Sequence, residues 1–181
     1  MKSSSNQYGS VAVTIHWLSA IFIIAMLGSG FVATSTTGND AKSTILAFHV
    51  SLGVVILFLT LLRIFWWWRV DHKPNPVKGD PAWQTFTAKA IHILFYIVIL
   101  GMIASGIGMV VLSGAGGVLF GAVEGTLPNF TEFLPRVPHG LGARLMATLF
   151  FLHAGAALYH HFIKRDGLIW RMWFGSKGAD T

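Results

Sequence analysis

The sequence has no cysteine and few charged residues, and both shortages limit what the chain can do. Without cysteine there can be no disulfides, thiolate metal sites or thiol chemistry. Only 11% of the 181 residues are charged, against about 25% in soluble domains. Hydrophobic residues make up 54%, and the mean hydropathy is +0.63. A soluble chain of this size could not cover so much apolar surface, so lipid is its expected solvent.

Acidic residues are also scarce, with seven Asp and Glu against thirteen Lys and Arg. The formal charge of +6 does not indicate a nucleic-acid partner, because the basic residues are scattered at the ends of apolar runs, as in membrane proteins. The first apolar run is too long for the hydrophobic region of a cleaved signal peptide. The eight histidines are therefore the main chemical resource of the chain.

Four apolar runs are long enough to cross a bilayer, which requires roughly 20 residues. We therefore predict an all-α fold, an integral membrane four-helix bundle of up-down-up-down order that forms one domain over residues 1–181. We see no convincing internal repeat. The predicted spans cover residues 11–33, 45–68, 88–112 and 139–163.

Lysine and arginine predict the orientation of the bundle. The N-terminus, the loop between the second and third spans and the C-terminus share one side and carry most of these residues. On the other side, only Lys42 and Arg136 lie in loops. By the positive-inside rule, both termini are cytoplasmic. The outer loop from Ser113 to Pro138 is long enough to fold over the mouth of the bundle.

Four histidines lie in or at the edges of the spans, at His16, His49, His139 and His153. His139 and His153 are fourteen residues apart, so they share one helix face and are about 21 Å apart along the axis. Because neighbouring spans run in opposite directions, His49 falls at the depth of His139 outside, and His16 at the depth of His153 inside. Paired imidazoles on facing helices suit a six-coordinate haem iron. The pattern predicts two haems b, with these four residues as the iron ligands.

A single histidine within a span often serves only as a hydrogen-bonding group between helices. That interpretation is open for each of the four residues taken alone. Ionisable groups in spans are costly, however, and four of them matched in depth favour two metal sites.

Two arginines and a glycine are predicted to complete haem binding. Arg63 follows His49 by fourteen residues, and Arg144 follows His139 by five. The predicted spans contain no Asp or Glu, so haem propionates would supply the anionic partners. Arg63 could instead snorkel to the cytoplasmic surface. Gly53, one turn after His49, would leave room for a flat macrocycle, with close helix packing as the alternative.

A quinone site is predicted on the cytoplasmic side. His160 follows His153 by seven residues, so it lies on nearly the same face and about 10 Å further out. Quinone reduction consumes two protons, and histidine is a suitable proton donor near neutral pH. Lys89 and His92 would line the same pocket. The alternative is that these residues simply face the lipid headgroups.

The histidines stand in short characteristic stretches, namely Ile-His-Trp-Leu at 15–18, Phe-His-Val-Ser-Leu-Gly at 48–53, His139, Leu-His-Ala at 152–154 and Ala-Leu-Tyr-His-His at 157–161. These stretches resemble those of the bacterial cytochrome b561 family, a group of small four-helix dihaem membrane cytochromes. The resemblance covers nearly the whole chain and implies a place in the bacterial inner membrane. It also implies that the four matching histidines are the haem ligands and that His160 resembles a quinone-site histidine. Members similar to this chain oxidise superoxide on the outer face and pass electrons through both haems to ubiquinone.

We therefore predict a superoxide:ubiquinone oxidoreductase, with His160 and Arg144 as catalytic residues. Lys42, Arg136 and Arg144 would attract the anion to the outer haem. The expected partners are membrane lipid, the quinone pool, and superoxide or another periplasmic electron donor. The oligomeric state is left open. One alternative is a cytochrome b subunit that anchors a larger enzyme, such as a hydrogenase or formate dehydrogenase. An alternative of another class is a haem-free transporter or channel.

Overall fold

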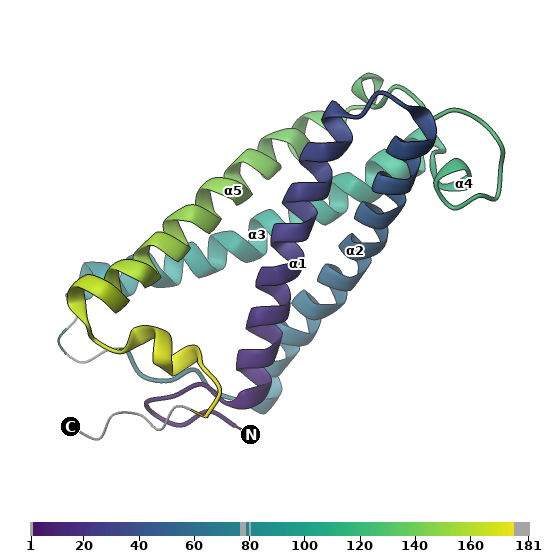
Figure 1. Ribbon diagram of the computed structural model, residues 1–181. Coiled ribbons are helices and arrows are strands. Elements are labelled where there is room, and N and C mark those ends of the chain that lie inside the picture. The colour runs from purple at the N-terminus through teal and green to yellow at the C-terminus, as the bar shows by residue number, and fades with distance from the viewer. Residues whose placement is uncertain (1, 77–78, 80, 176–181) are drawn as a thin grey trace.

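Four long helices dominate the computed structural model, which describes residues 2–76, 79 and 81–175 (Figure 1). They are α1 (Ser10–Ser35), α2 (Asn39–Phe65), α3 (Ala82–Ser113) and α5 (Arg136–Tyr159). π-Helical turns extend α2 and α5, namely η1 (Trp66–Val70) and η3 (His160–Lys164). The short elements are α4 (Gly116–Leu119), η2 (Phe130–Glu132) and η4 (Leu168–Met172). The described part of the chain contains no strand, so the all-α prediction is confirmed.

All four long helices are apolar enough and long enough to cross a membrane. Helices suit this environment because they satisfy their backbone hydrogen bonds internally. Large apolar side chains point outward along them, and Phe31 and Phe151, for example, are 77% and 71% exposed. In water such a surface would be unstable, whereas in lipid it is solvated. The chain is a multi-pass membrane protein.

Two helices begin earlier than the apolar runs predicted. The second span was expected from residue 45, yet α2 begins at Asn39, and the third was expected from residue 88, yet α3 begins at Ala82. Polar residues suit these first turns because the free backbone N–H groups of a helix N-terminus need water or an anion. In α2, Asp40 lies in the first turn, where a carboxylate complements the helix dipole.

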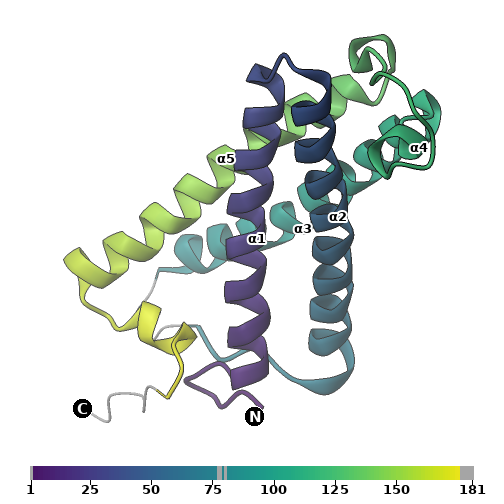
Figure 2. The ribbon, with the colours of Figure 1, turned by 45° about the vertical axis from the view of Figure 1, so that its right-hand side comes forward.

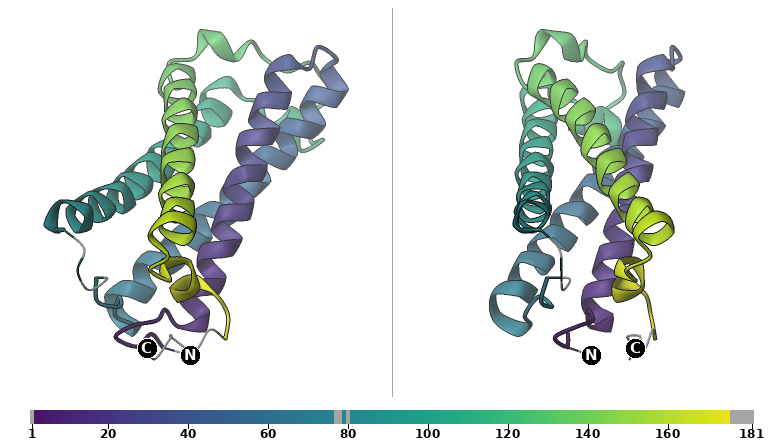
Figure 3. Two further views of the ribbon diagram at one scale, coloured as in Figure 1. Left: turned by 60° about the vertical axis from the view of Figure 1, so that its left-hand side comes forward. Right: turned by 90° about the vertical axis from the view of Figure 1, so that its left-hand side faces the viewer.

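The bundle is built from two antiparallel hairpins (Figures 1 and 2). In the first hairpin α1 packs along α2, and in the second α3 packs along α5. The three residues 36–38 join the helices of the first hairpin, while residues 114–135 join those of the second. We call the end of the bundle that carries these two connections the loop end. The opposite end, which holds residues 2–9, 66–76 and 164–175, is the terminal end (Figure 3).

At the terminal end, segments from distant parts of the sequence are tied together by hydrogen bonds. The Arg171 guanidinium donates from Nε to the Asn6 carbonyl at 2.7 Å and from Nη2 to the Asn75 carbonyl at 2.6 Å. The Trp17 indole donates to the Met172 carbonyl at 2.8 Å. The C-terminal segment therefore fastens the first helix and the loop between the hairpins.

Asp71 is a second fastening point at this end and is only 5% exposed. Its carboxylate accepts hydrogen bonds from the backbone and hydroxyl of Ser3, the backbone of His72 and the indole of Trp66. Burial raises the pKa of Asp71, but these hydrogen bonds lower it more, so the pKa lies below its ordinary value.

The long loop at the other end is anchored on the first hairpin. Its short helix α4 lies against α2, as Figure 1 shows, and the Leu127 backbone N–H donates to the Asn39 side chain at 2.9 Å. The part of the loop that forms α4 packs on α2, and Leu119 of α4 is buried.

Buried apolar side chains are few among the described residues, and most of them lie on the four long helices. In the second hairpin Val98, Met146 and Leu149 form the buried cluster, and Ile23 and Leu27 of α1 pack against it. α1 thus contacts both α2 and the core of the second hairpin, which keeps its inward face beside α5.

Candidate functional site

His49 of α2 and His139 of α5 face each other near the loop end. Their ring centres are 6.2 Å apart, and the ring planes are inclined at 64°. Both side chains are partly buried. The predicted pairing of these two residues at one depth agrees with this geometry.

Each ring of this loop-end pair is held from behind by a serine on the other helix of its hairpin. The Ser29 hydroxyl lies 2.9 Å from His49 Nδ1, and the Ser105 hydroxyl lies 3.0 Å from His139 Nδ1. The Met102 carbonyl is also 3.1 Å from His139 Nδ1. A carbonyl can only accept, so Nδ1 of His139 carries the proton and Nε2 keeps its lone pair for a metal.

A glycine follows each of these serines and gives the ring its space. A Cβ atom at Gly30 would lie 3.2 Å from Cε1 of His49, and one at Gly106 would lie 3.3 Å from Cε1 of His139. Such contacts are tight, so a larger residue would push the ring toward its partner.

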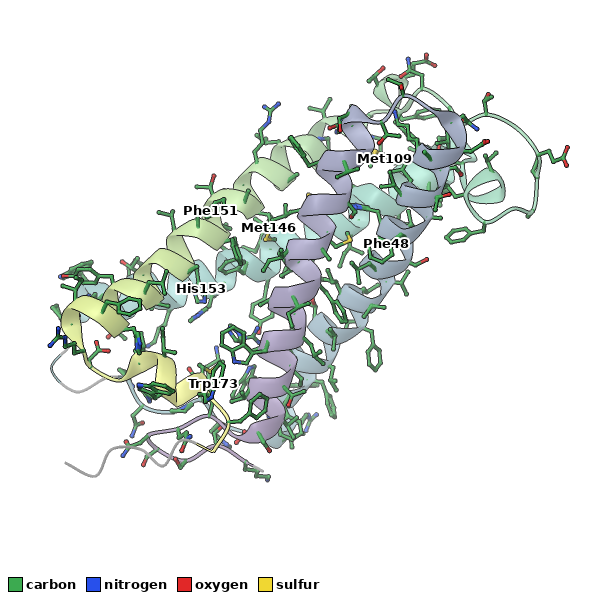
Figure 4. The ribbon with its side chains drawn as sticks, viewed as in Figure 1. Phe48, Met109, Met146, Phe151, His153 and Trp173 are labelled. Carbon is green, nitrogen blue, oxygen red and sulfur yellow. The ribbon has the colours of Figure 1, made fainter. Side chains whose placement is uncertain are left out.

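His16 of α1 and His153 of α5 form a second pair nearer the terminal end. Their ring centres are also 6.2 Å apart, with the planes inclined at 62°. Figure 4 shows His153 projecting from α5 on the side of α1. Within the described part of the chain, neither ring of this terminal-end pair makes a hydrogen bond, unlike the loop-end pair.

Both separations fit one iron between two imidazoles. A metal–imidazole bond is about 2 Å long and the ring centre lies about 1 Å beyond the nitrogen, so ring centres on opposite sides of one metal are about 6 Å apart. Two neutral nitrogen donors with no thiolate or carboxylate are a donor set that haem iron accepts. No group of three or more His, Cys, Asp and Glu suited to a metal ion occurs among the described residues. The separation of the two rings in each pair suits a planar cofactor that supplies the other ligands.

His92 also lies at the terminal-end pair. Its ring centre is 5.5 Å from that of His153, as is the ring of Phe95. The predicted quinone pocket of His160, Lys89 and His92 is not visible as a set of contacts. In the described residues, His160 makes no hydrogen bond or ring contact with the other two, and Lys89 is exposed. His92 instead lies beside His153 of the terminal-end pair.

Arg63 is half-buried at the terminal end and lies within electrostatic range of His16, His92 and His153. It forms no ion pair in the part of the chain that the structure describes. A half-buried cation beside the pair, with no acidic side chain to neutralise it, suits an anionic substituent such as a propionate. The haem-propionate prediction for Arg63 stays a prediction.

Among the described residues, neither Arg144 nor Gly53 makes a hydrogen bond or ion pair with a histidine ring of the two pairs. Arg144 is exposed on α5, and its guanidinium makes no hydrogen bond or ion pair with the described residues. The atom nearest to a Cβ placed at Gly53 would be Cε of Met26, at 3.6 Å. This contact agrees with the helix-packing alternative for Gly53, and its role beside a macrocycle stays a prediction.

A different arginine lies next to the loop-end pair. Arg136 is within electrostatic range of His139, and its Nη1 atom would lie 3.0 Å from a Cβ placed at Gly140. The guanidinium therefore lies back along the first turn of α5. The sequence predicts that Lys42, Arg136 and Arg144 attract an anion and that, of these three, only Arg144 is catalytic. In the structure it is Arg136 that lies within electrostatic range of the His139 ring.

His160 is 9% exposed at the terminal end and is hydrogen-bonded through Nδ1 to the Asp166 carboxylate. The chain turns back after η3 through Arg165, whose φ of 54° is left-handed, and this turn brings Asp166 against His160. Asp166 also accepts from the Leu168 backbone at 3.1 Å. The sequence predicted a role for His160 but missed its partner.

Cations gather around this end. Lys73 lies in the loop between the hairpins, within electrostatic range of Arg63 and Lys89. Burial and these two positive charges lower the pKa of Lys73 below its ordinary value. The terminal end is therefore electropositive near the His16–His153 pair.

The helices α1 and α3 carry an internal repeat, contrary to the sequence analysis. Eight of the sixteen residues from 15 to 30 recur 76 positions later, in 91–106. The recurring residues are Ile15, His16, Leu18, Ile21, Ile23, Met26, Ser29 and Gly30. The repeat matches His16 with His92 and each loop-end serine with the other. Because α2 and α5 share little beyond His49 and His139, the duplication is visible only when the first helices of the two hairpins are compared.

The chain matches known proteins over almost its full length. Residues 7–175 match the model of the family described as prokaryotic cytochrome b561. The chain is 29% identical to cytochrome b561 homolog 1 of Escherichia coli over 178 residues, which cover 92% of this chain and 97% of that protein. It is 26% identical to cytochrome b561 homolog 2 of the same organism, covering 98% and 96%. Identity to the probable superoxide oxidase CybB of Yersinia pestis is 27%, covering 92% and 95%.

Proposed function

The chain belongs to the prokaryotic cytochrome b561 family, whose members bind haem b and transfer electrons in membranes, and we propose that it is a dihaem superoxide:ubiquinone oxidoreductase. In this proposal one transmembrane domain holds a haem at each histidine pair. Electrons enter at the loop end and leave at the terminal end. Membership of a family of haem-binding electron-transfer proteins argues against the alternative of a haem-free transporter or channel.

The observation that carries the proposal is the equal spacing of the two pairs. His49–His139 and His16–His153 each have ring centres 6.2 Å apart, at two depths of one bundle. A hydrogen-bonding role between helices would not require the same separation twice. These four histidines would hold two haems, which supply reversible one-electron storage when bound.

The distribution of charge supports placing the terminal end in the cytoplasm. Lys73, Lys89, Arg165 and Arg171 lie in or beside the segments at that end. The loop end has Lys42 and Arg136. Positive charge is retained on the cytoplasmic side, so both termini would be cytoplasmic and the loop end would face the periplasm of a bacterial inner membrane.

Superoxide would give up its electron at the loop end. Two superoxide ions lose one electron each and leave as two molecules of oxygen, and these two electrons match the need of one quinone. Arg136 would attract the anion toward His139, because a cation beside the site raises the local concentration of a small anion. Arg144 is exposed further along α5 and would contribute at longer range.

Ubiquinone would be reduced at the terminal end. Quinol formation takes two electrons and two protons, and His160 would donate a proton from Nε2, since its Nδ1 is hydrogen-bonded to Asp166. Asp166 would orient the ring toward the quinone. His160 is seven residues from His153 on the same helix, so donor and electron source would be close. His92 and Lys89 remain proposed neighbours of this site.

The proposal is tested first by the reduced-minus-oxidised spectrum and pyridine haemochrome content of the detergent-purified protein, followed by rapid mixing with superoxide. We expect about two haems b per chain, reduced quickly by superoxide and reoxidised by ubiquinone. Two haems that ignore superoxide would favour a subunit that takes electrons from a larger enzyme, such as a hydrogenase. Absence of a haem band would return the four histidines to helix packing.

A further inference from the structure

The loop-end and terminal-end pairs differ in what lies behind their rings. Each loop-end ring has a hydroxyl within hydrogen-bonding distance of Nδ1, at 2.9 Å for His49 and 3.0 Å for His139. In the described residues, neither His16 nor His153 has such a partner. Arg63 lies within electrostatic range of both.

The hydrogens of this arrangement can be assigned. The Ser105 hydroxyl lies 2.8 Å from the Gly101 carbonyl and 3.0 Å from the Met102 carbonyl, so its proton goes to its own helix. Its lone pairs then face His139, which must donate. In α1, the Ser29 hydroxyl donates to the Met26 carbonyl at 3.1 Å, and His49 also hydrogen-bonds the Met26 backbone.

The internal repeat gives independent support, because it places the same cradle in both hairpins. Met26, Ser29 and Gly30 recur in α3 as Met102, Ser105 and Gly106, and in both copies they stand ten, thirteen and fourteen residues after the matched histidine. The serine holds Nδ1, and the glycine after it leaves 3.2–3.3 Å for the ring edge. The same serine–glycine arrangement thus contacts both His49 and His139, which indicates that the two serines share one role at the loop-end pair.

We propose that Ser29 and Ser105 are positioning residues that fix His49 and His139 as Nδ1–H tautomers and set the potential of the loop-end haem below that of the terminal-end haem. A ring that donates its second N–H becomes a more basic ligand, which stabilises ferric iron and lowers the potential. A cation lies within electrostatic range of each pair, Arg63 at the terminal end and Arg136 at the loop end, so the serine hydrogen bonds are what distinguishes the two sites. A lower potential at the loop-end haem favours electron movement from the loop end to the terminal end.

This inference rests on the haem ligation in the proposed function but not on superoxide or quinone. If the wild-type protein held no loop-end haem, the proposed function would fail. If it held that haem and the serines had no effect on it, only the inference would fail.

The test is a spectroelectrochemical titration of both haems, with EPR spectra, for the wild type and for Ser29→Ala, Ser105→Ala and the double variant. The loop-end haem is identified as the one lost in His49→Ala. We expect a positive shift of its midpoint potential in each single variant, a larger shift in the double variant, and a changed EPR g value for that haem alone. Ser29→Thr and Ser105→Thr, which keep the hydroxyl, should leave the midpoint potential of the loop-end haem close to its wild-type value.

The matched control is Ser19→Ala. Ser19 is in the same helix as Ser29 and donates to the Ile15 carbonyl at 2.7 Å; among the described residues it makes no hydrogen bond to a histidine. We expect both potentials to stay at their wild-type values in this variant. Unchanged potentials and g values in the double variant, or a wild-type loop-end haem of higher potential than the terminal-end haem, would overturn the proposal.

Discussion

The loop-end and terminal-end pairs share a ring separation of 6.2 Å and differ in almost everything around it. At the loop end, the two rings come from equivalent helices of the two hairpins, and each is backed by an equivalent serine. At the terminal end, the repeat matches His16 with His92 rather than with its partner His153. Arg63, fourteen residues after His49, stands where the second hairpin has His153, fourteen after His139.

This difference shows how one duplicated hairpin can provide two unlike sites. At the loop end, the repeat relates His49 to His139, so their surroundings match. At the terminal end, the repeat does not relate His16 to His153. Their equivalent positions in the other hairpin are His92 and Arg63, which can therefore serve other functions. Histidine and arginine there bring positive charge and proton-exchange capacity to the end where we propose that quinone is reduced.

Removing the proposed haem ligands tests the difference between the two pairs most directly. Both His16→Ala and His49→Ala should lower the haem content from about two to about one per chain, because each site then lacks one axial ligand. His92→Ala should retain both haems, since its 5.5 Å ring separation from His153 is shorter than the 6.2 Å that the two pairs share. Pyridine haemochrome assays per chain measure this. Retention of two haems in His16→Ala together with loss in His92→Ala would reassign the ligand.

Changes at His160 should affect only the terminal end. We expect His160→Gln to slow quinol formation by about 10²-fold, the usual contribution of a proton donor, and Asp166→Asn by roughly tenfold through poorer orientation. Haem reduction by superoxide should be unchanged, which stopped-flow absorbance can follow separately from quinol formation. The matched control is His161→Gln, whose ring packs on Trp170 instead. Equal slowing in the control would mean that the turn, and not the proton donor, was disturbed.

The hydrogen bonds at the two ends should also differ in how much they contribute to the stability of the folded protein. Asp71→Asn should destabilise the protein by about 2 kcal/mol at neutral pH, because a buried carboxylate with several donors loses charge-assisted hydrogen bonds. Asn39→Ala at the loop end breaks one neutral hydrogen bond and should cost about 1 kcal/mol. Thermal unfolding in detergent measures both.

The effect of Asp71 should depend on pH in a defined direction. Its pKa in the folded protein lies below the ordinary value of 3.8, so its contribution is fully present above that value. The contribution is lost as the pH falls through the folded pKa. The gap between wild type and Asp71→Asn should therefore stay constant from neutral pH down to about pH 5 and narrow in stronger acid. A gap that widened in acid would contradict this assignment.

The smallest expected effect concerns the approach of superoxide to the loop end. Arg136→Gln should reduce the second-order rate of haem reduction by superoxide roughly threefold at low salt, because a cation near His139 is lost. Arg144→Gln should have a weaker effect, and salt should diminish both differences. Reduction by neutral donors should be unaffected. A larger effect for Arg144 would contradict this order and favour the catalytic role that the sequence predicted for Arg144.

The sequence predicted the helices and the pairing of the four histidines because both depend on simple periodicity. Long apolar runs mark the spans, and the fourteen-residue step in α5 sets two depths on one face. Helix starts were missed at Asn39 and Ala82 because polar first turns leave no hydropathy signal.

The surroundings of the rings were not predictable in the same way. Ser29 and Ser105 look like ordinary small residues of a span, and only the packing of α1 on α2 and of α3 on α5 brings them to Nδ1. Asp166 lies beyond the last span, and its approach to His160 depends on a left-handed Arg165, a conformation that favours glycine. The repeat, by contrast, was present in the sequence and could have identified the two serines.

The fastening of the terminal end by Arg171 has a consequence for biogenesis. The residues that it joins, Asn6 and Asn75, are translated before the third and fourth helices, while Arg171 follows all four. During synthesis the loop-end pair is complete once the first turn of α5 has left the ribosome. The terminal-end pair must wait for His153, and its closure must wait for the segment beyond the last helix. The two pairs are thus completed one after the other. In the proposed orientation, the terminal end would stay accessible to cofactor delivery from the cytoplasm until translation of this segment is over.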